Sequence, residues 1–101
     1  MQERVLSVRI RVLAIAGGCL EGCFLSEAID RQRAVGVGEW WACTIDDWAE
    51  TLVVGRRVVE RCRRKLRTDG FLEERRQGLP AKLFYRVDLA EVERRLEADF
   101  G

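Results

Sequence analysis

The sequence predicts a small α+β domain, mostly α, in which two helices joined by a tight turn precede a β-hairpin and a last helix. Three observations support this fold class. Apolar residues recur at helical spacing in 44–68 and 89–100, whereas residues 71–87 form two strand-like runs around a break that contains Gly78 and Pro80. The chain of 101 residues has the length of one domain, so we expect a single domain over residues 1–101.

The N-terminal part predicts one clear helix. Residues 5–16 begin with strand-like alternation and end with residues that suit a helix, so a short strand and a short helix both remain open. Residues 19–34 predict an amphipathic helix that ends at Gly36 and Gly38. Its apolar stripe, at three- and four-residue spacing, consists of Leu20, Cys23, Phe24 and Ala28. The aromatic-rich residues 40–43 then favour a small strand.

Two further helices should follow at about 44–53 and 56–68. Thr44 is a good start for the first, because its hydroxyl can accept a free amide of the first turn and nearby acids complement the positive helix end. The buried face of this helix should consist of Ile45, Trp48 and Leu52. The second helix should bury Val59, Cys62 and Leu66 and stop at Asp69 and Gly70.

The turn between these helices departs from the usual pattern. Such turns often contain Gly because the backbone needs a positive φ, but this chain has Val53, whose branched side chain suits that geometry poorly. The N-cap of the second helix is Gly55, which caps more weakly than Ser. We therefore expect a turn of a different shape.

A hairpin and a last helix complete the chain. The strands 71–76 and 83–87 should be joined by a six-residue loop at 77–82, which gives a hairpin over about 71–87. The last helix, at about 89–100, has one apolar edge formed by Leu89, Val92, Leu96 and Phe100. This edge either packs within the domain or forms a dimer seam.

Positive charge is concentrated on the second helix and the hairpin. Residues 51–86 hold eleven Arg or Lys against four acids, whereas residues 1–50 and 87–101 each hold three more acids than bases. A helix, a tight turn, a basic helix and a basic hairpin in this order are typical of a winged helix-turn-helix, with the two-stranded β-hairpin as its wing.

Five segments resemble the winged-helix domain of phage and plasmid replication initiators and replisome organisers. These are WW at 40–41, TIDDW at 44–48, RR at 56–57, KLRTDGFLE at 65–73 and GLPAKLFYRV at 78–87. The resemblance covers about residues 20–95, and the double aromatic and the hairpin are its most specific parts. It implies double-stranded DNA binding in replication or transcription regulation of a phage or other mobile element.

The expected DNA contacts follow from how a helix fits the major groove. The side chains off the buried stripe of 56–68 face outward: Arg56, Arg57, Glu60, Arg61 and Arg64. We expect Arg57 and Arg61 to contact bases, because Arg can bind guanine O6 and N7 with two bonds. Glu60 could accept from cytosine or orient an arginine. The phosphate contacts are assigned to Arg56, Arg64 and Lys65.

The hairpin supplies Arg75, Arg76 and Lys82, placed to contact phosphate or the minor groove. The alternative interpretation is that all these cations form a solvated surface, as runs of charge often do. Trp48 should lie in the core, whereas Trp40 and Trp41 should point to opposite sides of a strand, which leaves one of them exposed.

The four cysteines favour free thiols over metal ligands. Cys19 and Cys23 could lie on one face of a helix and bind Zn²⁺, but paired CxxC spacing and histidine are missing. Cys23 and Cys62 fall on apolar stripes, where cysteine behaves as a small hydrophobe. With no Gly-rich phosphate loop and no nucleophile beside a base, we expect neither an enzyme nor a cofactor.

The partners follow from this interpretation. We expect double-stranded DNA, no membrane and a cytoplasmic protein, because no apolar run reaches the length of a membrane span and residues 1–4 do not resemble a signal peptide. A homodimer is favoured, since helix-turn-helix proteins commonly pair to match two half-sites. The main rival is a protein-interaction module, such as a phage-encoded adaptor or inhibitor that binds a replication or other host protein. A transcriptional repressor is the third option.

Overall fold

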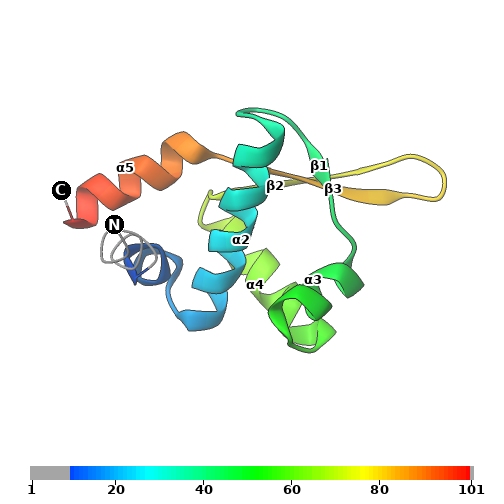
Figure 1. The fold of residues 1–101 in the computed structure, drawn as a ribbon, viewed down its shortest axis with the longest axis horizontal. Coiled ribbons are helices and arrows are strands. Elements are labelled where there is room, and N and C mark those ends of the chain that lie inside the picture. The colour runs from blue at the N-terminus through cyan, green and yellow to red at the C-terminus, as the bar shows by residue number, and fades with distance from the viewer. Residues whose placement is uncertain (1–9, 101) are drawn as a thin grey trace.

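A computed structural model describes residues 10–100, which form an α+β fold that is mostly helical (Figure 1). A first helix spans Ile10–Ala16, so this part of 5–16 is a helix and not a strand. Residues 5–9 lie outside the described residues. The elements that follow are α2 (Cys19–Val35), β1 (Trp41–Ala42), α3 (Ile45–Leu52), α4 (Arg56–Thr68), β2 (Leu72–Gln77), β3 (Lys82–Val87) and α5 (Leu89–Phe100). All the helices predicted after residue 18 are confirmed.

The sheet has three antiparallel strands in the order β1-β3-β2, so the expected two-stranded hairpin is extended by one strand. Strand β1 pairs Trp41 with Tyr85 at the inner side of the sheet. Strands β2 and β3 pair from Leu72↔Val87 to Gln77↔Lys82. The predicted six-residue loop is therefore wrong: Gln77 and Lys82 belong to the strands, and only residues 78–81 connect them.

The core lies where the inner face of the sheet meets α2, α3 and α4. Trp48 of α3 is fully buried and stacks on Phe24 of α2, with ring centroids 3.9 Å apart. Tyr85 of β3 meets the Trp48 ring edge-on at 5.9 Å, and Trp41 completes the cluster. Burial of Val59, Cys62 and Leu66 fixes the inner side of α4, as predicted.

The apolar stripe predicted for α2 is only half correct. Phe24 and Ala28 are buried, but Leu20 and Cys23 are exposed. The reason is that α2 also buries Leu25, Ile29 and Gln32, so the centre of its inner face is shifted past Phe24 and away from Cys23. Cys23 is therefore not a small core residue.

The two ends of the molecule differ in shape (Figure 1). The turn of the β2–β3 hairpin projects at one end, and α5 lies at the other, beside the helix Ile10–Ala16. On α5, Val92 is buried while Leu89 and Leu96 pack partly against the core and Phe100 is 44% exposed. The predicted edge is thus largely used within the chain, and a homodimer stays a prediction.

Within residues 10–100, no single helix is long and apolar enough to cross a membrane. Only the helices Ile10–Ala16 and Cys19–Val35 taken together have the required length and composition, and they are bent by 114° relative to each other.

Candidate nucleic-acid interface

The turn between α3 and α4 has the left-handed geometry that the sequence argued against. Thr44 caps α3 as expected, with its Oγ1 accepting from the Asp47 amide at 3.0 Å. At the other end of α3, Val53 has φ 55° and ψ 49°, and its amide donates to the Ala49 and Glu50 carbonyls. The expectation of another turn shape is wrong, because these hydrogen bonds hold a branched residue in a conformation that glycine usually adopts. Its side chain is 87% exposed.

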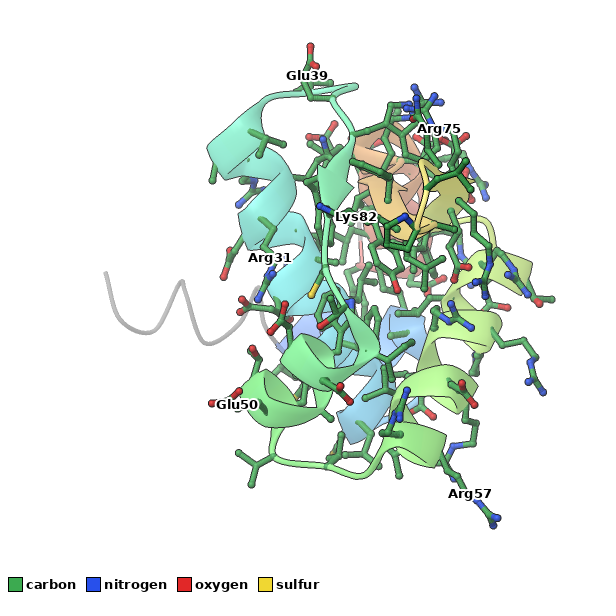
Figure 2. All side chains as sticks on the ribbon, turned by 90° about the vertical axis from the view of Figure 1, so that its right-hand side faces the viewer. Arg31, Glu39, Glu50, Arg57, Arg75 and Lys82 are labelled. Carbon is green, nitrogen blue, oxygen red and sulfur yellow. The ribbon has the colours of Figure 1, made fainter. Side chains whose placement is uncertain are left out.

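The outer face of α4, defined by Arg57, Arg61 and Arg64, is exposed along its length. Figure 2 shows Arg57 at one end of the helix, directed away from the body of the protein. Among residues 10–100, no carboxylate lies within ion-pair distance of any of these three guanidinium groups. Glu60 is exposed on the same helix and, within the described chain, pairs with no cation. Three positive charges are therefore left to a partner or to solvent.

Two other predicted contacts on α4 are engaged inside the chain. Arg56 forms an exposed ion pair with Asp46 of α3, at 3.4 Å. Lys65 donates to the Asp69 carboxylate at 2.7 Å, and its ammonium lies against Gly17, where an added Cβ would stand 2.9 Å from Nζ. Lys65 is thus on the flank of α4 that faces the N-terminal helices.

The opposite flank of α4 is tied to the hairpin by Glu74 of β2. Arg63 Nε lies 3.4 Å from Glu74 Oε1, and Arg67 Nη1 donates to Oε2 at 3.1 Å. The side chains of Arg63 and Glu74 are only 15% and 8% exposed, so this pair is largely desolvated. Tyr85 lies opposite Glu74 in the sheet, and burial raises the pKa of its hydroxyl. We call this arrangement the Glu74 bridge; it fixes α4 relative to the hairpin.

The hairpin cations lie on both faces of the sheet rather than on one. Arg75 and Arg76 are neighbours in β2, and neighbours in a strand point to opposite faces. Arg76 is on the side of α4 and lines, with Arg67 and Glu74 among others, a groove of about 210 Å³ between helix and hairpin. Arg75 is on the other face, where its guanidinium carbon lies 4.4 Å from the centre of the Trp40 ring.

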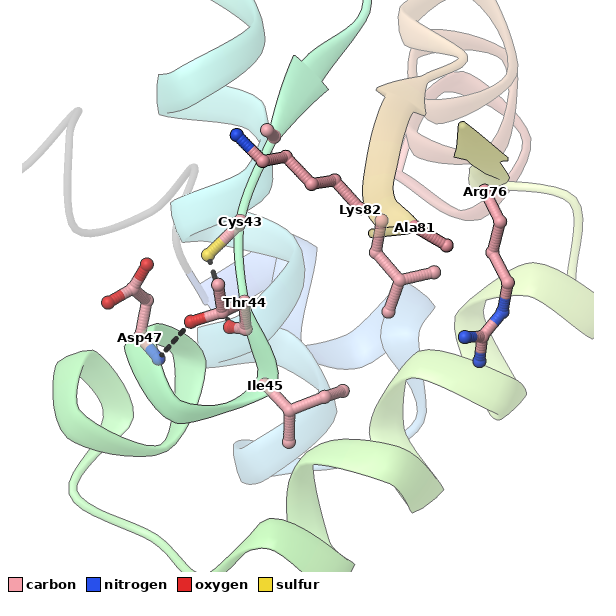
Figure 3. Close-up of a pocket in the computed structure, with 9 residues that line it drawn as sticks. Cys43, Thr44, Ile45, Asp47, Arg76, Ala81 and Lys82 are labelled. Atoms are coloured by element: carbon pink, nitrogen blue, oxygen red, sulfur yellow. Dashed lines mark hydrogen bonds between the residues drawn. The ribbon is translucent and has the colours of Figure 1, made fainter. Parts of the chain in front are cut away.

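A larger groove of about 350 Å³ lies between the hairpin and the start of α3 (Figure 3). Lys82 extends along it towards Cys43, while Arg76 is directed towards α4. Its walls combine the apolar Ile45 and Leu83 with these cations and with Asp47. The structure therefore brings Arg76 near the α4 side and places Lys82 at the edge of the sheet.

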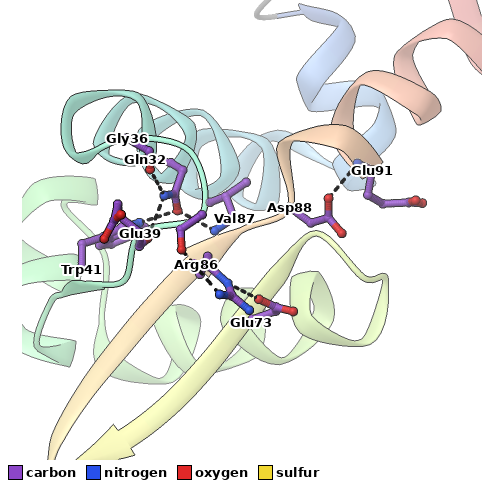
Figure 4. Close-up of polar contacts among 10 residues, drawn as sticks. Gln32, Gly36, Glu39, Trp41, Glu73, Arg86, Val87, Asp88 and Glu91 are labelled. Atoms are coloured by element: carbon purple, nitrogen blue, oxygen red, sulfur yellow. Dashed lines mark hydrogen bonds and ion pairs between the residues drawn. The ribbon is translucent and has the colours of Figure 1, made fainter.

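Gln32 of α2 forms four hydrogen bonds, two with the segment that follows α2 and two with the sheet (Figure 4). Its fully buried amide donates to the Gly36 and Glu39 carbonyls at 2.7 and 2.8 Å. Its Oε1 accepts from Trp41 Nε1 at 2.9 Å and from the Val87 amide at 2.7 Å. Every donor and both lone pairs of the side chain are used, so Gln32 positions both β1 and β3.

The cysteines are divided between surface and core. Cys43 and Cys62 are buried, and burial raises the pKa of both thiols. Cys43 Sγ also accepts from Arg31 Nη1 at 3.3 Å. Cys19 and Cys23 are exposed on α2. Over residues 10–100, the structure does not gather three or more of the side chains that usually bind a metal ion.

Sequence reasoning missed the residues that position this surface: Arg63, Arg67, Glu74 and Gln32. The sequence did indicate the position of Glu74, because strand alternation from the buried Leu72 places Glu74 on the inner side of β2. An acid at an inward position next to an arginine-rich helix indicates an ion pair. Gln32 had no comparable signal, since its partners lie in the loop after α2, in β1 and in β3, and no periodic pattern connects these groups.

No family model matches this chain, and no curated protein or solved structure resembles it significantly. The likeness to replication initiators therefore depends only on the sequence segments quoted above.

Proposed function

We propose that this protein binds double-stranded DNA as a winged helix, with α4 as its recognition helix and the β2–β3 hairpin as its wing. The observation that carries the proposal is the outer face of α4, where Arg57, Arg61 and Arg64 are exposed and none has an acidic partner in residues 10–100. Exposed guanidinium groups without an acidic partner favour a ligand with many hydrogen-bond acceptors, and a helix with such a face fits the major groove.

The Glu74 bridge supports the same proposal. A recognition helix and a wing contact one duplex together only if the angle between them is fixed. Arg63 and Arg67 meet Glu74 at the junction, and the largely desolvated Arg63–Glu74 pair favours one angle between helix and hairpin. Arg76 faces the gap between helix and hairpin, and Lys82 lies towards the hairpin tip, so both suit backbone phosphates.

The contacts are assigned by position. Arg57 and Arg61 lie in the N-terminal half of α4 and suit base edges, whereas Arg64 suits a phosphate. Arg56 and Lys65 have acidic partners, at 3.4 and 2.7 Å, and would have to exchange them for phosphates. We place the activity in replication or transcription regulation of a phage or other mobile element, in line with the resemblance of the hairpin and the double aromatic.

A mobility-shift selection on random duplexes, followed by affinity measurements with variants, tests the proposal. Arg57→Ala or Arg61→Ala should weaken the selected site by ~1–3 kcal/mol and affect unrelated duplexes less. Lys82→Ala should weaken all duplexes alike. Arg94→Ala on α5 is the matched control, because it removes the same charge as the α4 variants from a guanidinium paired with Glu91. Equal effects of Arg57→Ala and Arg94→Ala would refute the assignment of α4.

A protein-interaction module is the second candidate, and one feature favours it. Val53 and Leu79 are almost fully exposed apolar side chains, at the turn before α4 and at the hairpin tip. Apolar side chains in such positions suit a protein surface better than a phosphate backbone. Under this alternative, no duplex would bind better than about micromolar at low salt, which is within the range of non-specific DNA binding.

A further inference from the structure

The outer face of the sheet carries a second group of cationic and aromatic side chains. Trp41, Tyr85 and Val87 point into the core, so by alternation their neighbours point away from it. We call these outward residues the sheet platform: Trp40, Arg75, Lys82, Phe84 and Arg86. They come from three adjacent strands or their immediate ends, and they lie on the face opposite to the helices.

The platform is organised around the indole of Trp40. The guanidinium carbons of Arg75 and Arg86 lie 4.4 and 4.5 Å from the centre of its ring. Arg86 is held by Glu73, to which its Nε donates at 2.6 Å. Arg75 has no acidic partner within residues 10–100. Planar groups are thus fixed next to one another before any ligand arrives, which lowers the entropic cost of binding.

The chemistry of the platform fits one kind of ligand. Arg75 and Arg86 both lie against Trp40, and of these two only Arg86 has an acidic partner within residues 10–100, Glu73, so the surface keeps positive charge and attracts an anion. Trp40 and Phe84 are partly exposed, and aromatic rings and arginine planes are the groups on which unpaired bases stack. A duplex hides the faces of its bases, and an acidic peptide would use the cations but not the rings. From this combination we propose that the sheet platform binds single-stranded nucleic acid.

This binding is separate from duplex recognition by α4, because the outer face of the sheet and the outer face of α4 belong to different surfaces. Lys82 is used in both proposals, whereas Arg75 belongs to the platform alone. The test therefore uses residues that are unique to each surface: Trp40 for the platform, and Arg57 with Arg61 for α4.

Tryptophan fluorescence gives a direct measurement. Trp41 and Trp48 are 6% and 0% exposed, so quenching by a bound base reports Trp40. An oligothymidylate of about 16 nucleotides, long enough for a typical single-strand site, should quench the emission at about 0.15 M salt. Oligouridylate of the same length distinguishes RNA from DNA, and tighter binding of either supports the proposal.

Variants then separate the two surfaces. Trp40→Leu should weaken single-strand binding about tenfold, which corresponds to the loss of one stacked base, and should leave duplex binding much less affected. The double variant Arg57→Gln/Arg61→Gln should do the reverse. If Trp40→Leu fails to fold, a 5-iodouracil oligonucleotide crosslinked to the wild-type protein should be mapped to Trp40 or Phe84 by mass spectrometry.

Three results would overturn the proposal: no quenching by either oligonucleotide, a crosslink confined to α4, or equal competition by polyglutamate of the same charge. The last would show that the platform recognises negative charge and not bases. Loss of duplex binding alone would contradict the function proposed for α4 and leave the platform intact.

Discussion

Helix α4 carries arginines on two sides, and their surroundings differ. On the outer face, Arg57, Arg61 and Arg64 meet no carboxylate among residues 10–100, whereas Arg63 and Arg67 on the sheet side share Glu74. The same residue type therefore lacks an acidic partner within residues 10–100 on one side of the helix and joins the helix to the sheet on the other. The difference teaches that the position of a single acid, and not the density of arginine, decides which guanidinium groups are available to a ligand.

The largest expected effect comes from removing that acid. Glu74→Gln leaves the guanidinium of Arg63, 15% exposed, without its charge partner, so we expect a loss of about 3–5 kcal/mol in the free energy of unfolding. Glu73→Gln is the matched control on the other face of β2: its pair with Arg86 is partly exposed and should contribute less than about 1 kcal/mol. Urea unfolding followed by circular dichroism measures both. Similar losses for the two variants would show that the Glu74 bridge contributes no more to stability than the partly exposed Glu73–Arg86 pair.

The second prediction concerns the other junction between helices and sheet. Gln32→Leu keeps the volume of the side chain but leaves Trp41 Nε1 and the Val87 amide buried without an acceptor. We expect a loss of about 3 kcal/mol in the free energy of unfolding. Gln77→Leu, at an exposed position of β2, should change it by less than about 0.5 kcal/mol. A Gln32→Leu variant as stable as the wild type would show that the buried amide network is not needed to hold the sheet.

A smaller effect of opposite sign is expected at the turn before α4. Val53→Gly should relieve the left-handed conformation and raise the free energy of unfolding by about 1 kcal/mol. Val54→Gly should instead destabilise the protein, because Val54 packs partly against the core. Thermal unfolding of the two variants compares them directly. A loss of stability in Val53→Gly would mean that the exposed valine contributes contacts which outweigh its strain.

Much of the fold was predictable because it depends on local patterns. The stripe of Val59, Cys62 and Leu66 predicted α4 and its buried side, Gly55 and Asp69 marked its ends, and the alternation of β2 and β3 predicted the hairpin. The outward direction of Arg57, Arg61 and Arg64 followed from the same stripe. These features need only the periodicity of a helix or strand, which the sequence contains in full.

The remaining features depend on contacts between distant segments. The shift of the buried face of α2 towards Leu25 and Ile29 follows from how α2 packs on the sheet, so Cys23 was wrongly expected to be buried. The division of Arg75 and Arg76 between two faces followed from strand alternation, but the stacking of Arg75 on Trp40 required β1 to join the sheet. Pairing across the fold is the information that periodicity alone does not carry.

The salt dependence of duplex binding tests the central claim, that the outer face of α4 and the hairpin contact DNA. With about four phosphate contacts, from Arg56, Arg64, Arg76 and Lys82, the logarithm of the affinity should fall with the logarithm of salt concentration at a slope of about −3 to −4 per monomer. Arg64→Gln should reduce the slope by about 0.9, while Arg94→Gln on α5 should leave it unchanged. A slope near zero, or the same slope for both variants, would contradict the account.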